Sequence, residues 1–193
     1  MGKAATRIAR WAITGAQWKR IAGWSLVEMV IALAIGAMLL TFGVPAYQDW
    51  MASQQLLHHA QLLAQTLTLA RTEAVKHGYR VNVCKSADGR ECADTGRWDM
   101  GFLMHTDDNA DGTIDGDEAL LRVEGPAPSD ITIDANRPLD DYVSFTSLGH
   151  ARLLSGALQM GTFTVCKPGR DALLVVLANS GRVRIDRSGQ RCS

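Results

Sequence analysis

Residues 26–44 read LVEMVIALAIGAMLLTFGV, an apolar run whose only charged side chain is Glu28. At about 1.5 Å of rise per residue, a helix of this length suits the roughly 30 Å hydrocarbon core of a bilayer. The run continues directly into a helical pattern, and no small-x-small cleavage site of a secretory signal peptide follows it. The run therefore predicts a membrane-spanning helix near the amino terminus.

The flanks of the run differ in charge. Residues 1–23 hold five of the 20 basic side chains and none of the 20 acidic ones, and the first charge after the run is Asp49. The positive-inside rule then places residues 1–23 in the cytoplasm and the remainder outside. A chain that starts at Trp24 has 15 basic and 20 acidic residues, so it has no general attraction for nucleic acid.

Glu28 is costly within an apolar span, and such a charge usually has a partner. Its surroundings read Gly23-Trp24-Ser25-Leu26-Val27-Glu28. A plain signal anchor is the alternative interpretation, and the charged Glu28 argues against it. The segment resembles the prepilin peptidase site of type IV pilins and type II secretion pseudopilins. It departs from that family in having Trp rather than Phe after the glycine, and in having a long leader.

The resemblance implies a set of processing and assembly roles. Prepilin peptidase would cleave after Gly23, and Trp24 would become the N-methylated terminus. Glu28 would pair with the terminal amine of a neighbouring pilin during filament assembly. Pro45 falls where the family commonly has a helix-kinking proline. The protein would sit in the inner membrane with its carboxy-terminal head in the periplasm, and then enter a filament.

A second helical pattern follows Pro45. Small and apolar residues recur at spacings of three and four on one helix face, which predicts an amphipathic helix that ends in Lys76-His77 with Gly78 as the C′ residue. The residues of this face are Leu56, Ala60, Leu63, Leu67, Ala70 and Ala74. The whole helix, Trp24 to His77, would be roughly 80 Å long.

From Tyr79 the pattern changes to short alternating runs separated by Gly, Pro, Asn and Asp, which predicts an antiparallel head of one or two sheets. The expected strands are Tyr79–Cys84, Trp98–His105, Ala119–Val123, Ile131–Ile133, Val143–Phe145, Gly161–Cys166, Leu173–Ala178 and Arg182–Ile185. The fold class is thus α+β, with the long amino-terminal helix of the type IV pilin fold packed on the head. The expected segments are a leader (1–23), a transmembrane or filament-core helix (24–45), an amphipathic helix (46–77) and an extracytoplasmic head (78–193).

The head resembles the FimT/GspH-like minor pilins. The matching stretches are residues 83–89 with Cys92, Trp98-Asp99-Met100-Gly101-Phe102, the Asp-rich loop before Leu120, and Gly181-Arg182-Val183-Arg184. With the amino-terminal helix, this resemblance covers nearly all of residues 23–193.

The four cysteines all lie beyond residue 80, without a CxxC motif. In an exported domain they predict two disulfides, and the pairing that joins sequence neighbours is Cys84–Cys92 with Cys166–Cys192. In a cytosolic protein they would be free structural thiols.

We find no GxSxG, P-loop, HExxH or GxGxxG motif, so the sequence predicts no enzyme. Residues 107–118, DDNADGTIDGDE, do satisfy the spacing of an EF-hand calcium loop. Two interpretations stay open: a calcium loop and a solvated turn in which Asp and Asn bond their own backbone. The calcium ligands would be Asp107, Asn109, Asp111, Asp115 and Glu118, with the backbone carbonyl of Thr113.

The carboxy-terminal segment 167–193 has a net positive charge, with six basic residues and two acidic ones. On a strand, Arg182 and Arg184 would point outward together, and Gly181 would let the backbone approach a ligand or close a hairpin. The GRxR pattern resembles the DNA-contacting motif of FimT-type minor pilins. The alternative is a solubilising edge strand. Weaker candidate DNA contacts are Lys167, Arg170, Arg187 and Arg191.

The preferred interpretation is a minor pilin that joins or primes a type IV pilus and binds DNA non-specifically during natural transformation. The alternatives are a GspH-type pseudopilin of a type II secretion system, a priming pilin without DNA affinity, and a calcium-sensing adhesive head.

Overall fold

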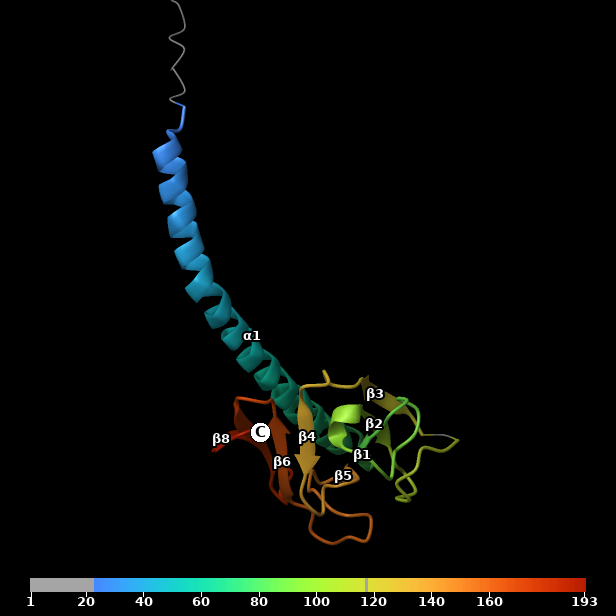
Figure 1. The fold of residues 1–193 in the computed structure, drawn as a ribbon. Coiled ribbons are helices and arrows are strands. Elements are labelled where there is room, and N and C mark those ends of the chain that lie inside the picture. The colour runs from blue at the N-terminus through green and yellow to red at the C-terminus, as the bar shows by residue number, and fades with distance from the viewer. Residues whose placement is uncertain (1–22, 117) are drawn as a thin grey trace, which may run out of the picture. The chain divides into compact units, whose positions relative to one another are not determined.

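The computed structural model describes residues 23–116 and 118–193, which form parts of two compact units, Met1–Val44 and Pro45–Ser193 (Figure 1). The predicted cytoplasmic leader, apart from Gly23, lies outside the described residues.

Helix α1 comprises Leu26–His77 and continues through Pro45. The Ser25 hydroxyl accepts a hydrogen bond from the Glu28 amide at 3.2 Å, so Ser25 is the N-cap of the helix. Gly78 ends it with φ of +78°, and its amide donates to the Ala74 carbonyl at 3.0 Å. The expected start at Trp24 is therefore two residues too early, because Ser25 has the cap position.

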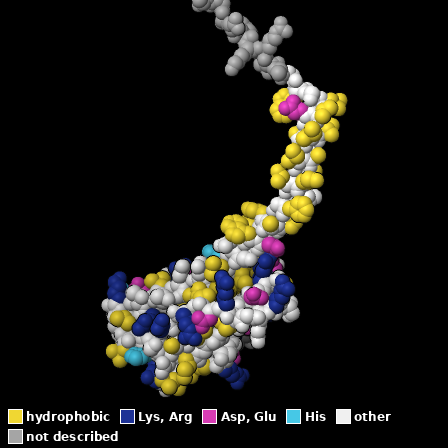
Figure 2. All heavy atoms as spheres, turned by 90° about the vertical axis from the view of Figure 1, so that its left-hand side faces the viewer, with side chains coloured by type: hydrophobic (Ala, Val, Ile, Leu, Met, Phe, Trp, Pro, Cys, Tyr) yellow, Lys and Arg dark blue, Asp and Glu magenta, His cyan; other side chains and the backbone are white. Residues whose placement is uncertain are grey.

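The part of α1 in the first unit is apolar and long enough to cross a membrane. Its large side chains are exposed, as Figure 2 shows by the yellow spheres along this segment. This is a candidate membrane anchor.

The second unit buries one face of α1. The predicted apolar face of the helix is confirmed. All six of its residues are buried, and Thr66 is buried with them. Three of the six are alanines with no exposed surface, so small side chains make up half of this buried face.

The head consists of two four-stranded sheets in which all neighbouring strands are antiparallel. The first sheet has the order β3-β2-β1-β5, formed by Leu120–Glu124, Phe102–Thr106, Val81–Lys85 and Tyr142–Phe145. The second has the order β4-β6-β7-β8, formed by Thr132–Ala135, Gly161–Cys166, Asp171–Leu177 and Val183–Arg191. All eight expected strands exist, with ends shifted by up to several residues.

One continuous core joins the α1 stripe to the inner faces of both sheets. Val83 and Phe102 of the first sheet and Phe163 and Val175 of the second belong to it. The outer face of β1 and β2 is buried as well, since both strands are buried along their whole length. That outer face presents Cys84 and the polar side chains of Asn82 and His105.

The expectation of one strand over Trp98–His105 is wrong at its start. Trp98–Met100 form a 3₁₀ turn, η1, and β2 begins only at Phe102. The turn inserts the Trp98 ring into the core, edge-on to Phe163 at 5.0 Å between centroids, while its indole N–H donates to the Leu139 carbonyl at 3.0 Å. Tertiary packing of one large side chain thus overrides the local strand pattern.

The last strand also differs from its expected range. β8 begins at Val183, one residue after Arg182, and extends to Arg191. Two disulfides, Cys84–Cys92 and Cys166–Cys192, are present, in the pairing that the sequence predicts. The second bridge attaches the end of β6 to the residue after β8.

Candidate nucleic-acid interface

β8 is an edge strand, bonded to β7 on one side only. Four arginines of the predicted DNA site, Arg182, Arg184, Arg187 and Arg191, are exposed along it or just before it. Arg182 lies in the turn that connects β7 to β8, where its carbonyl accepts a hydrogen bond from the Ala178 amide at 2.9 Å. The four predicted arginines thus lie exposed on, or next to, an edge strand of the second sheet.

Arg184 has an ion-pair partner on its own strand. Its Nε lies 2.8 Å from a carboxylate oxygen of Asp186, and both side chains are about half exposed. Sequence reasoning missed Asp186, although the i, i+2 spacing on a strand puts the two side chains on one face. A phosphate must displace this carboxylate to reach the Arg184 fork.

Lys167 and Arg170 are placed differently from the other four. Lys167 is buried, and its ammonium contacts the Asp130 carboxylate and, at 3.0 Å, the Gln55 side chain. The hydrogen bond from Lys167 lowers the pKa of Asp130. Arg170 is half-buried and pairs with Asp49 of α1. The two cations thus connect the sheet to α1, and they do not extend the exposed basic surface.

The basic residues of the tail separate into two ends of β8. Arg182 lies at the α1 carboxy-terminal end, since Gly181 before it contacts Arg71. Arg187 and Arg191 lie at the other end, where they line a cavity of about 380 Å³ with Ser53 and Leu57 of α1. Val183 pairs with Leu177 and Arg191 with Asp171, so six residues of β7, at about 3.3 Å each, put the two ends of β8 roughly 20 Å apart. A ligand that contacts all four arginines must therefore be long.

Gly181 has a packing role. Its φ is +77°, and a β-carbon on it would lie 2.1 Å from the carbonyl oxygen of Gly149 and 2.9 Å from Nε of Arg71. The Arg71 Nε donates to that same carbonyl at 3.0 Å. Of the two roles expected for Gly181, hairpin closure is the one seen, and the residue is buried rather than open to a ligand.

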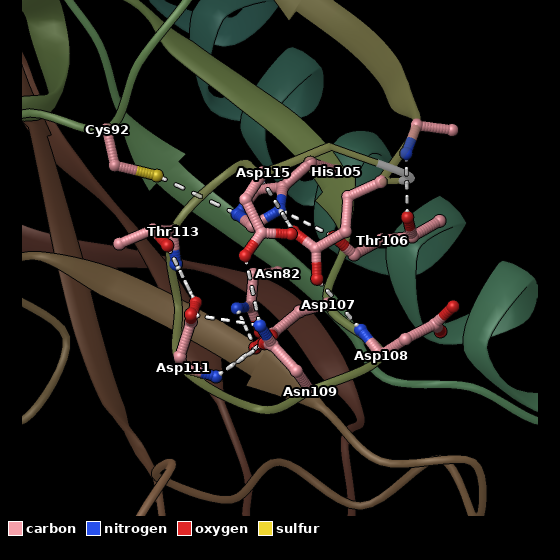
Figure 3. A network of polar contacts seen from close by, with 12 residues as sticks. Asn82, Cys92, His105, Thr106, Asp107, Asp108, Asn109, Asp111, Thr113 and Asp115 are labelled. Carbon is pink, nitrogen blue, oxygen red and sulfur yellow. Dashed lines mark hydrogen bonds and ion pairs between the residues drawn. The ribbon is translucent and has the colours of Figure 1, made fainter.

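The Asp-rich loop, residues 107–118, bonds to itself (Figure 3). Asp107 is buried and accepts from the Asn82 amide at 2.5 Å and from the Asp111 amide at 3.1 Å. Asp111 accepts from the Thr113 amide at 2.8 Å and hydroxyl at 2.7 Å, and these bonds lower its pKa.

The other proposed calcium ligands of the loop also bond within it. Asn109 donates to Asp111 and Asp115 at 2.9 and 3.1 Å, and Glu118 accepts from the Asp108 amide at 3.0 Å. The structure thus has the bonding expected of a solvated turn, and calcium binding stays a prediction from the spacing.

The residues with predicted processing and assembly roles lie in the first unit or at its border. Gly23, Trp24, Glu28 and Pro45 are all exposed. Exposure is compatible with contact to a peptidase, to lipid or to other subunits.

We expect Gly181→Ala to destabilise the head more than Gly169→Ala does. Both glycines have φ near +78°, so both substitutions have a backbone cost of roughly 1–2 kcal/mol. Only at Gly181 does the new β-carbon collide with backbone, because nothing lies within 4 Å at Gly169. Thermal unfolding of both variants measures the difference, and equal losses would contradict the packing role.

We expect Asp111→Ala to lower the melting temperature near neutral pH and to have a smaller effect at an acidic pH below the usual carboxyl pKa. The folded pKa of Asp111 is below its usual value, so its contribution is present above the usual carboxyl pKa and is lost as the pH falls through the lowered one. Thermal melts at both pH values measure this.

The same melts with millimolar calcium test the calcium prediction. A gain in melting temperature in the wild type that Asp111→Ala abolishes would support calcium binding, and an unchanged melting curve would leave a plain turn.

The chain matches one family model and is similar to several solved structures. The sequence model of the type II transport protein GspH matches residues 59–189. Among solved structures, the type IV minor pilin FimU of Pseudomonas aeruginosa PAO1 is 21% identical with a TM-score of 0.55, covering 73% of this chain and 95% of that one. The minor pseudopilin EpsH of the Vibrio cholerae Type 2 Secretion System is 16% identical with a TM-score of 0.48, covering 70% and 99%.

The likeness to FimU is one of fold: a long amino-terminal helix packed on antiparallel sheets. The family match covers more than half of the chain. The chain therefore belongs to the GspH family, as a FimT/GspH-like member of the type IV pilins and pseudopilins.

Proposed function

We propose that this chain is a minor type IV pilin that enters or primes a filament and binds DNA without sequence preference during natural transformation. The observation that supports this function best is the row of exposed arginines on and next to the edge strand β8. Members of the family are structural proteins that assemble with other pilins, and the proposal assigns this chain no enzymatic activity.

The arginines have the chemistry for phosphate. Arg182 is the last residue of the turn and Arg184 the second residue of β8, so their Cα atoms are at most about 7 Å apart, which lets the two guanidinium groups reach neighbouring phosphates of one strand. The planar guanidinium grips phosphate oxygens with two parallel hydrogen bonds. None of the four arginines is set in a recognition helix that could enter a groove, so binding through them is independent of base sequence.

Two features keep the affinity of a single subunit low. Asp186 competes with phosphate for Arg184, and the chain from Trp24 onward has more acids than bases. We expect a dissociation constant in the non-specific range of about 10⁻⁴ to 10⁻⁶ M. Several subunits or partner pilins along one filament raise the apparent affinity by avidity.

The amino-terminal segment supports the membrane and filament part of the proposal. Prepilin peptidase cleaves after Gly23, Trp24 becomes the methylated terminus, and the apolar part of α1 anchors the subunit in the inner membrane with the head in the periplasm. Within a filament, Glu28 pairs with the terminal amine of a neighbour. That pairing offsets the cost of a carboxylate in an apolar environment.

We expect filaments from a host with prepilin peptidase to contain a chain that begins at N-methylated Trp24. Mass spectrometry of the purified filament reads the terminus directly, and an intact Met1 there would refute the assignment. Glu28→Gln keeps the size of the side chain but removes its charge, so it should reach the membrane without entering filaments. Wild-type filament levels for Glu28→Gln would remove the assembly role.

We expect replacement of Arg182 and Arg184 by Gln to weaken binding to all DNA sequences alike. Each lost phosphate contact lowers the magnitude of the slope of log K against log salt by about one, so the double variant should lose about two. Titration of residues 45–193 with duplexes of unrelated sequence, over a range of salt, measures both quantities. Asp186→Asn should act in the opposite direction, because it frees Arg184.

The matched control is Arg90→Gln with Arg137→Gln, which removes the same charge from exposed positions away from β8. This control should keep the wild-type slope. If Arg182→Gln with Arg184→Gln binds like the wild type, β8 is a solubilising edge and the GspH-type pseudopilin without DNA binding becomes the better assignment.

A further inference from the structure

The disulfide Cys84–Cys92 lies against a buried histidine on the outer face of the first sheet. Cys84 of β1 pairs with Leu103 of β2, and His105 is two residues further along β2, so both side chains point to the same face. Both are almost fully buried. Cys92 comes from the irregular segment between β1 and η1. Two of the three side chains are thus fixed by strands, and the third is attached to a loop.

The hydrogen bonds of His105 determine which ring nitrogen is free. Nδ1 lies 2.7 Å from the Thr106 carbonyl, which accepts only, so Nδ1 has the proton and donates. In the neutral ring, Nε2 then has a lone pair, and it lies 3.7 Å from the sulfur of Cys92 (Figure 3). In the oxidised protein that sulfur has no proton to give, so this lone pair has no donor there.

The arrangement is that of a metal-ligand set with its supporting groups. The Cys84 sulfur, the Cys92 sulfur and a ring nitrogen of His105 all lie within 4.8 Å of one another, and no other such group of three His, Cys, Asp or Glu occurs in residues 23–116 and 118–193. A carboxylate oxygen of Glu118 lies 3.8 Å from Nδ1. A histidine that ligates a metal usually donates its other N–H to a carbonyl or carboxylate in this way.

We propose that Cys84, Cys92 and His105 form a redox-gated site for a thiophilic cation such as Zn²⁺, which is closed while the disulfide is intact. A dithiol supplies two electrons and two protons, the sulfur–sulfur bond breaks into two thiols, and the dithiol becomes a disulfide. Zn²⁺ then displaces the two thiol protons and binds two thiolates and the Nε2 lone pair, with a fourth position for water.

The change needs a small movement of the two sulfurs. Zn–S bonds of about 2.3 Å at a tetrahedral angle put the two sulfurs about 3.8 Å apart, so they must separate. The backbone beside Cys92 is held, because the Ala93 amide donates to the Lys85 carbonyl at 2.8 Å and the Glu91 carbonyl accepts from the Ser86 hydroxyl at 2.6 Å, so rotation of the cysteine side chains supplies the movement. The metal would close the same loop that the disulfide closes, so the metal-bound dithiol and the disulfide exclude each other. Before the head is oxidised, the metal would supply the cross-link of this loop.

The test is zinc binding to the full chain in detergent, with the disulfides intact and after reduction by a phosphine. We expect one tight Zn²⁺ per reduced chain that the oxidised chain lacks, and a thiolate-to-cobalt absorption band when Co²⁺ replaces Zn²⁺. His105→Gln removes the nitrogen ligand and keeps both thiols, so affinity should fall at least tenfold. Cys166→Ser with Cys192→Ser is the matched control, because it removes the other pair of thiols and should bind as the wild type does.

Three outcomes would overturn the proposal. Equal affinity in His105→Gln would mean that thiols alone, in a folded or unfolded chain, hold the metal. Binding by the oxidised chain as strong as by the reduced one would point to the Asp-rich loop instead. Loss of binding in the Cys166→Ser, Cys192→Ser control would place the metal at the carboxy-terminal pair.

Discussion

The close packing of the second half of α1 against both sheets is the contact on which the rest of the head depends. The buried face of the helix contributes Leu56, Leu63 and Leu67 to the same core cluster as the inner residues of both sheets. Without this helix, each four-stranded sheet would have an uncovered apolar face. The edge strand β8 is positioned by the same contact, because Ile185 packs against the core cluster while the arginines beside it remain exposed.

Much of this architecture could be predicted from the sequence because it is determined by local periodicity. The 3.6-residue stripe of α1 and the alternation of the eight strands are short-range patterns, and each produced an element of the predicted type. The failures have long-range causes. Trp98 interrupts a strand pattern because its ring packs against Phe163, which is 65 residues away in the chain. No local pattern contains that contact.

In the candidate DNA site as well, local features could be predicted from the sequence and long-range contacts could not. The tail is basic by composition, but composition does not tell which cations are free. Lys167 pairs with Asp130, and Arg170 pairs with Asp49, only in the folded chain, since these acids are far away in sequence. Asp186 is different, because its i, i+2 spacing from Arg184 can be seen in the sequence. Counting charges in the sequence therefore overestimated the number of exposed basic residues in the tail. In the structure, the exposed ones are the four arginines at the edge of the second sheet.

The bridge between Cys166 and Cys192 has a mechanical consequence. β8 is continuous with β7 through a tight turn at one end and is covalently attached to the end of β6 at the other. An edge strand held only by its ladder of hydrogen bonds would peel from its free end when a load pulls on it. Here the segment between the two cysteines is a closed ring, so tension applied at any arginine of β8 passes through a covalent bond into the interior of the sheet. The outermost strand of the head can thus bear load like an inner one.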